Sequence, residues 1–191
     1  MRRSSAASVF ARHLAPDDIV VCGLGSTARA WREQKAPQLA YYASDPMGLG
    51  PALALGLALS RPDRRVVLLE GDGDLAMNLG VLLTIAGAAP TNLRAAVFIN
   101  DRYETGGGQP LPNAGRISYV VLAAGSGWPW TGEAHDETQL GRLVPTLLER
   151  PGLGLLALHV DVEPSPYPAD PGPTSQAEDR AIFQRRLAGE R

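Results

Sequence analysis

Two short polar motifs contain the residues best suited to chemistry. Asp72 lies between Gly71 and Gly73, and Asn100 follows Asp72 by 28 residues. A carboxylate and an amide oxygen are hard ligands, and together with phosphate oxygens and water they suit octahedral Mg²⁺. Glycines beside the carboxylate also let a phosphate-bearing ligand approach the backbone closely. These residues indicate a metal ion bridged to a phosphate ligand, but they do not identify the ligand.

The elements that must position both motifs are buried strands. The runs 66–69 and 93–99 are short and largely apolar, and each ends where one of the motifs begins. Between them, leucines at helical spacing over 75–88 predict a helix. Apolar strands that alternate with helices predict a three-layer α/β/α, doubly wound domain with a mainly parallel sheet. Ligands bind beyond the carboxyl ends of such strands, so we expect the two motifs to lie near each other.

The other expected elements follow from the same patterns. Strands are expected at 19–22 and 153–160, and helices at 4–14, 47–59, 116–124, 137–149 and 176–187. The helix over 47–59 is apolar on nearly every side, which predicts burial on every face. Residues 28–45 show no clear pattern. A proline-rich stretch over 164–173 divides the chain into a domain at 1–163 and an extension with a terminal helix at 164–191.

The composition argues against several classes of protein. Of the 191 residues, 45% are hydrophobic and 20% are charged, which is ordinary for one globular domain. The net charge of −2 and the lack of a basic stripe argue against a nucleic-acid partner. No segment reaches the ~18 apolar residues that a membrane helix requires. A single cysteine suits a reducing compartment, so we expect a cytoplasmic protein with no membrane contact.

The spacing of the two motifs resembles the signature of thiamine diphosphate enzymes, in the domain that binds the diphosphate of the cofactor. The similarity runs from about residue 5 to about residue 162. Segments 54–59, 75–80 and 107–110, together with Tyr103, look like the same half of sulfopyruvate and phosphonopyruvate decarboxylases. The resemblance implies a thiamine diphosphate-binding fold, with thiamine diphosphate and Mg²⁺ as cofactors.

The resemblance also implies which residues form the site. The metal ligands are Asp72, Asn100 and the backbone carbonyl of Arg102. The cofactor-binding residues are Ser26, with Thr27 as a weaker candidate, the carbonyl of Asp45, and Met47, Gly71, Gly73, Asp74 and Asn100. Met47 corresponds to the bulky residue that packs between the two rings of the cofactor, and either this role or ordinary core packing is compatible with its type. Tyr103 and Gln109 lie in the loop expected to face the substrate.

Five positions depart from the family pattern. Ile99 precedes Asn100 where a second polar residue is usual, and Asp45-Pro46 replaces a common Gly-Ser. Gly106 replaces a common threonine. Asp74 often corresponds to a serine that binds the diphosphate, and a carboxylate there must turn away or face the metal. These departures leave the substrate open.

The resemblance further implies a heteromer that decarboxylates a small 2-oxo acid. Enzymes of this family need a second, pyrimidine-binding domain whose glutamate activates the cofactor, and 191 residues hold only one domain. We therefore expect a partner subunit to supply that glutamate. The implied substrate is a three-carbon 2-oxo acid with a second anionic or polar group, such as sulfopyruvate or phosphonopyruvate.

Alternative interpretations remain open. The same residues fit a carboligase or acyl-transferring subunit, a non-catalytic scaffold homologue, or a glycine-rich turn with capping residues. Residues 23–28 imitate a dinucleotide-binding fingerprint, although the polar stretch 31–37 does not continue as the required helix. Cys22 is expected to act as a small hydrophobic residue. His13, His135 and His159 are scattered along the chain, and we expect structural or surface roles for them.

Overall fold

A six-stranded sheet forms the centre of the computed structural model, which describes residues 1–43, 46–163 and 175–189. The strands are β1 (Ile19–Cys22), β2 (Leu39–Tyr42), β3 (Val66–Gly71), β4 (Leu93–Ile99), β7 (Thr131–Ala134) and β8 (Gly154–His159). Their order is β2-β1-β3-β4-β8-β7, and every neighbouring pair is parallel. A separate two-stranded hairpin joins β5 (Arg102–Tyr103) and β6 (Gln109–Pro110).

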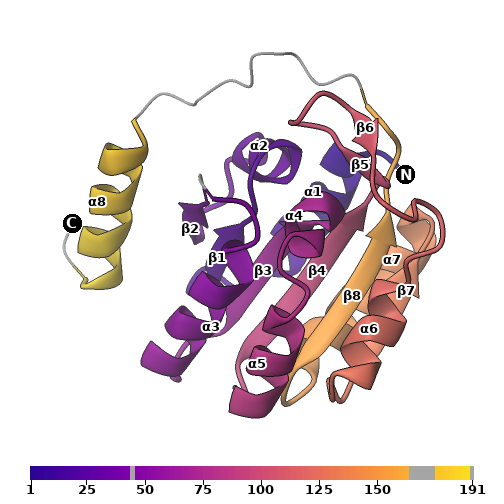
Figure 1. Cartoon of the computed structure of the whole chain (residues 1–191). Coiled ribbons are helices and arrows are strands. Elements are labelled where there is room, and N and C mark those ends of the chain that lie inside the picture. The colour runs from indigo at the N-terminus through magenta and orange to yellow at the C-terminus, as the bar shows by residue number, and fades with distance from the viewer. Residues whose placement is uncertain (44–45, 164–174, 190–191) are drawn as a thin grey trace.

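Helices cover both faces of the sheet (Figure 1). One face packs against α1 (Arg3–His13), α2 (Ser26–Arg32) and α7 (Glu137–Glu149). The other packs against α3 (Gly50–Ser60), α5 (Val81–Ala88), α6 (Tyr119–Gly125) and α8 (Gln176–Leu187), with the short α4 (Asp72–Ala76) following β3. The expected three-layer α/β/α fold is therefore confirmed, and its sheet is parallel throughout the described strands.

The inner strands β1, β3, β4 and β8 are largely apolar because both of their faces are buried. Along β3, Val66 and Leu68 join the core on one side of the sheet, whereas Val67 and Leu69 join the core on the other. Successive side chains of a strand point to opposite faces, so a sheet covered on both sides needs continuous apolar runs. This is why these strands were recognisable from the sequence.

The strand order changes direction between β1 and β3. From β1 the chain passes through α2 to β2 on one side, and then through α3 to β3 on the other side of β1. Such a switch point leaves a crevice beyond the carboxyl ends of the strands, where open α/β sheets bind ligands. The motifs at Asp72 and Asn100 follow β3 and β4 at this edge.

The prediction of a single helix over 75–88 is wrong. The structure has α4 and α5 instead, and a turn between them contains Asn78 and Gly80. Asn78 is a weak helix former, and its side-chain amide donates a hydrogen bond to the carbonyl of Gly48 at 3.0 Å. Gly80 adds a further helix-weakening residue. The hydrogen bond from Asn78 thus connects this turn to the loop that precedes α3.

The apolar helix expected over 47–59 begins at Gly50 and is not buried on every face. Leu59 is 56% exposed, and Leu49, just before the helix, is 49% exposed. An all-round apolar helix indicates contact on every side, but here one side has no cover among the described residues. Residues 28–45, which had no clear pattern, contain most of α2 and the strand β2.

The terminal helix α8 packs beside β2. Phe183 meets Tyr41 edge to face with ring centroids 5.2 Å apart, and Arg32 pairs with Asp179 at 3.3 Å. The proline-rich segment over 164–173 lies outside the described residues. No helix in the described part of the chain is long and apolar enough to cross a membrane.

Candidate functional site

Asp72 lies at the junction of β3 and α4 and is 2% exposed. One carboxylate oxygen, Oδ1, accepts a hydrogen bond from the backbone N–H of Gly73 at 2.8 Å. The other, Oδ2, accepts from the N–H groups of Asn100 at 3.0 Å and Asp101 at 2.6 Å. The hydroxyl of Tyr119 donates to the backbone carbonyl of Asp72 at 2.9 Å. The bonds to Oδ1 and Oδ2 connect the ends of β3 and β4 through the Asp72 carboxylate.

Burial raises the pKa of Asp72 from its usual 3.8 to about 6, although the backbone hydrogen bonds partly oppose the shift. A carboxylate held in this way is costly to ionise unless a cation lies nearby. The residue is therefore suited to binding a metal ion, whose charge would favour the ionised form.

This raised pKa predicts a pH dependence of the metal-free chain. Because the folded pKa exceeds the unfolded one, Asp72 stabilises the fold fully below about pH 4, and this contribution is lost as the pH rises to about 6. The lost contribution is about 2–3 kcal/mol. Urea unfolding at pH 4 and pH 7 should show this extra loss in the wild type relative to Asp72→Ala. Parallel pH profiles for the two proteins would contradict it.

The second motif adds two further candidate ligands. The side-chain oxygen of Asn100 accepts from the N–H of Arg102 at 3.1 Å, which folds the chain back after β4. Asp101 adopts a left-handed conformation, with φ of 58°, at this turn. The carbonyl oxygen of Arg102 lies 3.4 Å from where a Cβ on Gly73 would stand. Asn100 and the Arg102 carbonyl therefore lie beside the Asp72 segment, as the resemblance implied.

Asp74 turns away from this ligand set. Its Oδ2 accepts from the N–H of Leu24 at 2.9 Å, and its Oδ1 accepts from the N–H of Gly48. The carboxylate thus binds the loop after β1 to the loop before α3. Of the two orientations expected from the sequence, the structure has the one in which the carboxylate turns away from the expected metal site.

Glu70 is a buried residue that the sequence did not single out. It is 0% exposed, and burial, followed by its hydrogen bond to Asp74, raises the pKa of its carboxyl well above the usual value. A Cβ on Gly23 would lie 1.9 Å from Glu70 Oε1, and one on Gly50 would lie 2.5 Å from Oε2. A side chain at either position would collide with the Glu70 carboxylate, so both positions favour glycine. In the sequence, these two glycines were the only indication of the buried carboxylate.

A small pocket of about 40 Å³ connects most of the expected residues. Ser26, Thr27, Met47, Gly71, Asp72, Gly73, Asp74, Asn100, Arg102 and Tyr103 line it, with Arg3, Leu24, Phe98, Glu104 and Thr105. Sequence patterns gave no sign of Arg3, which comes from α1 and pairs with the half-buried Glu104 at 2.9 Å. Asp45 lies outside the described residues, and Gln109 is not part of the pocket lining.

The loop that carries Tyr103 and Gln109 lies against the metal motif. A Cβ on Gly73 would come within 2.9 Å of the Tyr103 ring, so only glycine allows this contact. Tyr103 and Gln109 are partners in the β5–β6 hairpin. Gln109 is exposed, and its side chain lies near the glycine loop over 106–108.

The residues present fit a magnesium–diphosphate group. The hydroxyl of Ser26 is buried and finds no hydrogen-bond partner among the described residues, although it lines the pocket beside Asp72. A buried hydroxyl without a partner is costly, and a phosphate oxygen would satisfy it. The carboxylate, amide and carbonyl oxygens beside it form the hard donor set that Mg²⁺ prefers.

The expectation that the three histidines are scattered is wrong for two of them. His135 and His159 stack with ring centroids 4.2 Å apart, beside Glu133. His13 lies elsewhere, where its Nδ1 is 2.8 Å from the carbonyl of Val9 in α1. The pairing arises from the register of β7 and β8, which the sequence did not reveal because β7 is a short polar strand.

The fold and the site match known proteins. Residues 20–152 match the family described as thiamine pyrophosphate enzyme, C-terminal TPP binding domain. The sulfopyruvate decarboxylase subunit beta of Methanothermobacter thermautotrophicus is 41% identical over 93 residues, which are 49% of this chain and 50% of that subunit. The sulfopyruvate decarboxylase of Methanosarcina acetivorans is 37% identical over 137 residues, which are 72% of this chain and 35% of that protein.

A solved structure agrees on the fold. The thiamine diphosphate-dependent 4-hydroxybenzoylformate decarboxylase of Rhodococcus jostii RHA1 superposes with a TM-score of 0.72 at 21% identity, covering 86% of this chain and 33% of that one. This chain spans about half of the length of the first of these relatives and about a third of the second. The family match nevertheless covers more than half of the chain, including both polar motifs. The chain belongs to the family of thiamine pyrophosphate enzyme C-terminal TPP-binding domains.

Proposed function

We propose that this chain is the Mg²⁺- and diphosphate-binding subunit of a heteromeric thiamine diphosphate-dependent 2-oxo acid decarboxylase. The observation that carries the proposal is the carboxylate of Asp72, which joins the ends of β3 and β4 and lies beside Asn100 and the carbonyl of Arg102. These three residues would hold Mg²⁺. The ion would offset the charge of the diphosphate and the cost of ionising the buried Asp72.

The cofactor would extend from this pocket along the crevice. Ser26 and Thr27 would meet the diphosphate, and Gly71 and Gly73 would leave room for it. The pocket is too small to enclose a whole thiamine diphosphate, so the rings would pass Met47, which lines its edge. The role proposed for the Asp45 carbonyl, as acceptor of the aminopyrimidine amino group, lies outside the described residues.

Asp74 would act by positioning, because its oxygens are already bonded to backbone N–H groups. Its bond to the N–H of Gly48 holds the residue directly after Met47. Leu24, just before the loop that carries Ser26, is held by the other oxygen. The Asp74 carboxylate would therefore fix the distance between Met47, which would contact the cofactor rings, and Ser26 and Thr27, which would contact the diphosphate.

The proposed substrate is a small 2-oxo acid such as sulfopyruvate or phosphonopyruvate. Tyr103 lines the pocket, and Gln109, its exposed partner in the β5–β6 hairpin, lies in the same loop, so both would face the substrate. When bound, thiamine diphosphate supplies the carbon that attacks the keto group and accepts the electrons released with CO₂. This chain would orient both molecules and keep water from the reacting atoms.

The proposed partner is a pyrimidine-binding subunit that supplies the activating glutamate. One relative is named as a subunit beta, which supports a second chain in that protein. Large apolar side chains are also exposed on this chain, among them Leu49, Leu59, Met77, Leu79, Leu83, Val121 and Leu122. They come from α3, α5, α6 and the adjoining turns, which lie on one side of the sheet (Figure 1). Exposed apolar groups on one face are typical of a protein interface.

Product analysis tests the function. The chain would be assembled with a candidate pyrimidine-binding subunit and given Mg²⁺, thiamine diphosphate and either sulfopyruvate or phosphonopyruvate. We expect CO₂ and the corresponding aldehyde, identified by NMR. A carbon–carbon coupled product would instead identify a carboligase. If thiamine diphosphate failed to bind in an Mg²⁺-dependent manner with the partner present, the chain would be a non-catalytic homologue.

A further inference from the structure

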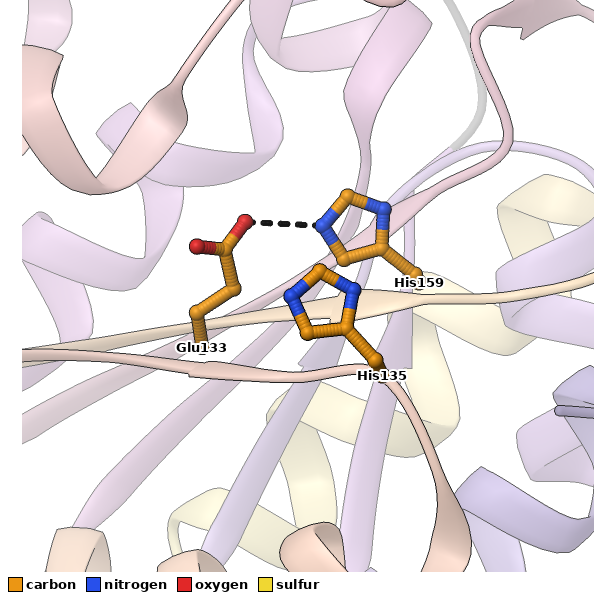
Figure 2. A group of neighbouring side chains, drawn as sticks. All are labelled: Glu133, His135 and His159. Carbon is orange, nitrogen blue, oxygen red and sulfur yellow. Dashed lines mark hydrogen bonds and ion pairs between the residues drawn. The ribbon is translucent and has the colours of Figure 1, made fainter.

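We propose that Glu133, His135 and His159 form a second metal site, which binds a first-row transition-metal ion of the zinc type. Glu133 lies on the edge strand β7, His135 directly follows that strand, and His159 ends the neighbouring strand β8 (Figure 2). Among the described residues they are the one group of three histidine, cysteine or acidic side chains that could hold a metal ion. The inference does not depend on the proposed function.

The strand register brings these side chains together. In the parallel pair, Glu133 lies opposite Ala157 and Ala134 lies opposite Leu158. The next step of the register places His135, directly after β7, beside His159 at the end of β8. Side chains two residues apart on a strand share a face, so Glu133 lies on the same side as His135.

The distances suit three ligands of one ion. His159 Nε2 lies 2.8 Å from Glu133 Oε1, and the two imidazole rings stack at 4.2 Å with an angle of 14° between their planes. One ligand atom from each residue lies within 4.8 Å of the others. Zinc bonds of about 2.0–2.2 Å place neighbouring ligand atoms about 3.3 Å apart. An imidazole coordinates in its own ring plane, so at least one of the stacked rings would turn about its side-chain bonds when the ion binds.

The backbone on both sides of the site is already held. The N–H of His135 donates to the side chain of Gln139 at 3.0 Å, and Asp136 caps the same helix, α7, by accepting from the N–H of Gln139 at 2.8 Å. On the other strand, the N–H after His159 donates to the carbonyl of Ile99 at 2.8 Å. A site with fixed backbone positions loses little entropy when the ion binds.

The ligand types distinguish this site from the Mg²⁺ site. Two imidazoles and one carboxylate suit zinc, nickel, copper or iron, whereas Mg²⁺ prefers oxygen ligands alone. Glu133 and His135 are exposed and His159 is half-buried, so water can occupy the remaining coordination positions. Three protein ligands with an open position are typical of exchangeable or catalytic zinc rather than of a closed structural site.

The two sites lie along the same edge of the sheet but on different strands. His159 is the register partner of Ile99, the residue before Asn100, and β7 lies one strand farther out. A metal ion held by this cluster would therefore not be the ion that binds the diphosphate.

Zinc titration of the tag-free full chain tests the proposal. After treatment with a chelator and its removal, the chain would be titrated with ZnCl₂ by calorimetry in excess Mg²⁺ and without thiamine diphosphate, whose phosphates bind zinc. We expect one Zn²⁺ per chain with a Kd on the order of micromolar, and a Tm higher by about 5 °C at saturation. Failure of the wild-type chain to bind one equivalent would overturn the proposal.

Variants identify the ligands. His135→Ala and His159→Ala should each weaken zinc binding by at least about 10-fold, and Glu133→Gln should weaken it while keeping a polar group beside His159. His13→Ala is the matched control and should bind like the wild type. Circular dichroism would establish that each variant is folded. Undiminished one-to-one binding in the folded His135→Ala/His159→Ala double variant would show that these residues are not the ligands.

Discussion

Replacing Asp72 by alanine is expected to weaken the Mg²⁺-dependent binding of thiamine diphosphate by about 30-fold or more. The substitution removes the one carboxylate of the proposed ligand set, and loss of a buried charged partner costs about 2–5 kcal/mol, which corresponds to this range. Calorimetry on the chain assembled with its partner subunit would measure the affinity at fixed Mg²⁺ concentration. Unchanged affinity would refute the metal assignment.

The fold is expected to survive this substitution. The Tyr119 hydroxyl bonds to the backbone carbonyl of residue 72, which alanine retains. Burial of the Asp72 carboxylate is itself unfavourable at neutral pH, as its raised pKa indicates, and this offsets part of the cost of losing its three backbone hydrogen bonds. Urea unfolding would measure stability alongside binding.

A matched control lies in the same loop. Asp101 contributes its backbone N–H to Asp72 and has φ of 58°, a conformation that asparagine tolerates well. Asp101→Asn removes one negative charge without removing a proposed ligand, and we expect the affinity to change by less than about threefold. Equal losses in Asp101→Asn and Asp72→Ala would mean that general electrostatics, rather than ligation, controls binding.

The isolated chain is expected to show less than roughly 1% of the turnover of the assembled heteromer, because the proposed activating glutamate belongs to the partner. Proton transfer by a positioned side chain contributes about 10²–10⁴-fold to a rate, so its absence has an effect of this size. The rate of CO₂ release from sulfopyruvate would be measured for this chain alone, the partner alone and the mixture.

Two controls accompany that comparison. Asp72→Ala mixed with the wild-type partner should be inactive, which would show that activity in the mixture requires the site on this chain. Thiamine diphosphate binding by the isolated wild-type chain should be weak but dependent on Mg²⁺. Robust decarboxylation by the isolated chain would disprove the two-subunit hypothesis.

The local patterns that predicted the fold share a physical cause. The apolar runs at β1, β3, β4 and β8 are buried on both faces by helices, so each is recognisable without knowledge of its neighbours. β7 escaped notice because an edge strand with polar residues lacks this pattern. The break between α4 and α5 also escaped notice, since it depends on the bond from Asn78 to Gly48, 30 residues earlier in the chain.

The sequence by itself determined a parallel α/β sheet with Asp72 and Asn100 at the carboxyl ends of two strands. Only the tertiary structure decided that β3 and β4 are neighbours, so that one carboxylate bonds to both strand ends. It also decided that Asp74 holds two loops and that His135 stacks on His159. Residue type and spacing report local burial and chemistry, whereas contacts between distant segments depend on strand order and register.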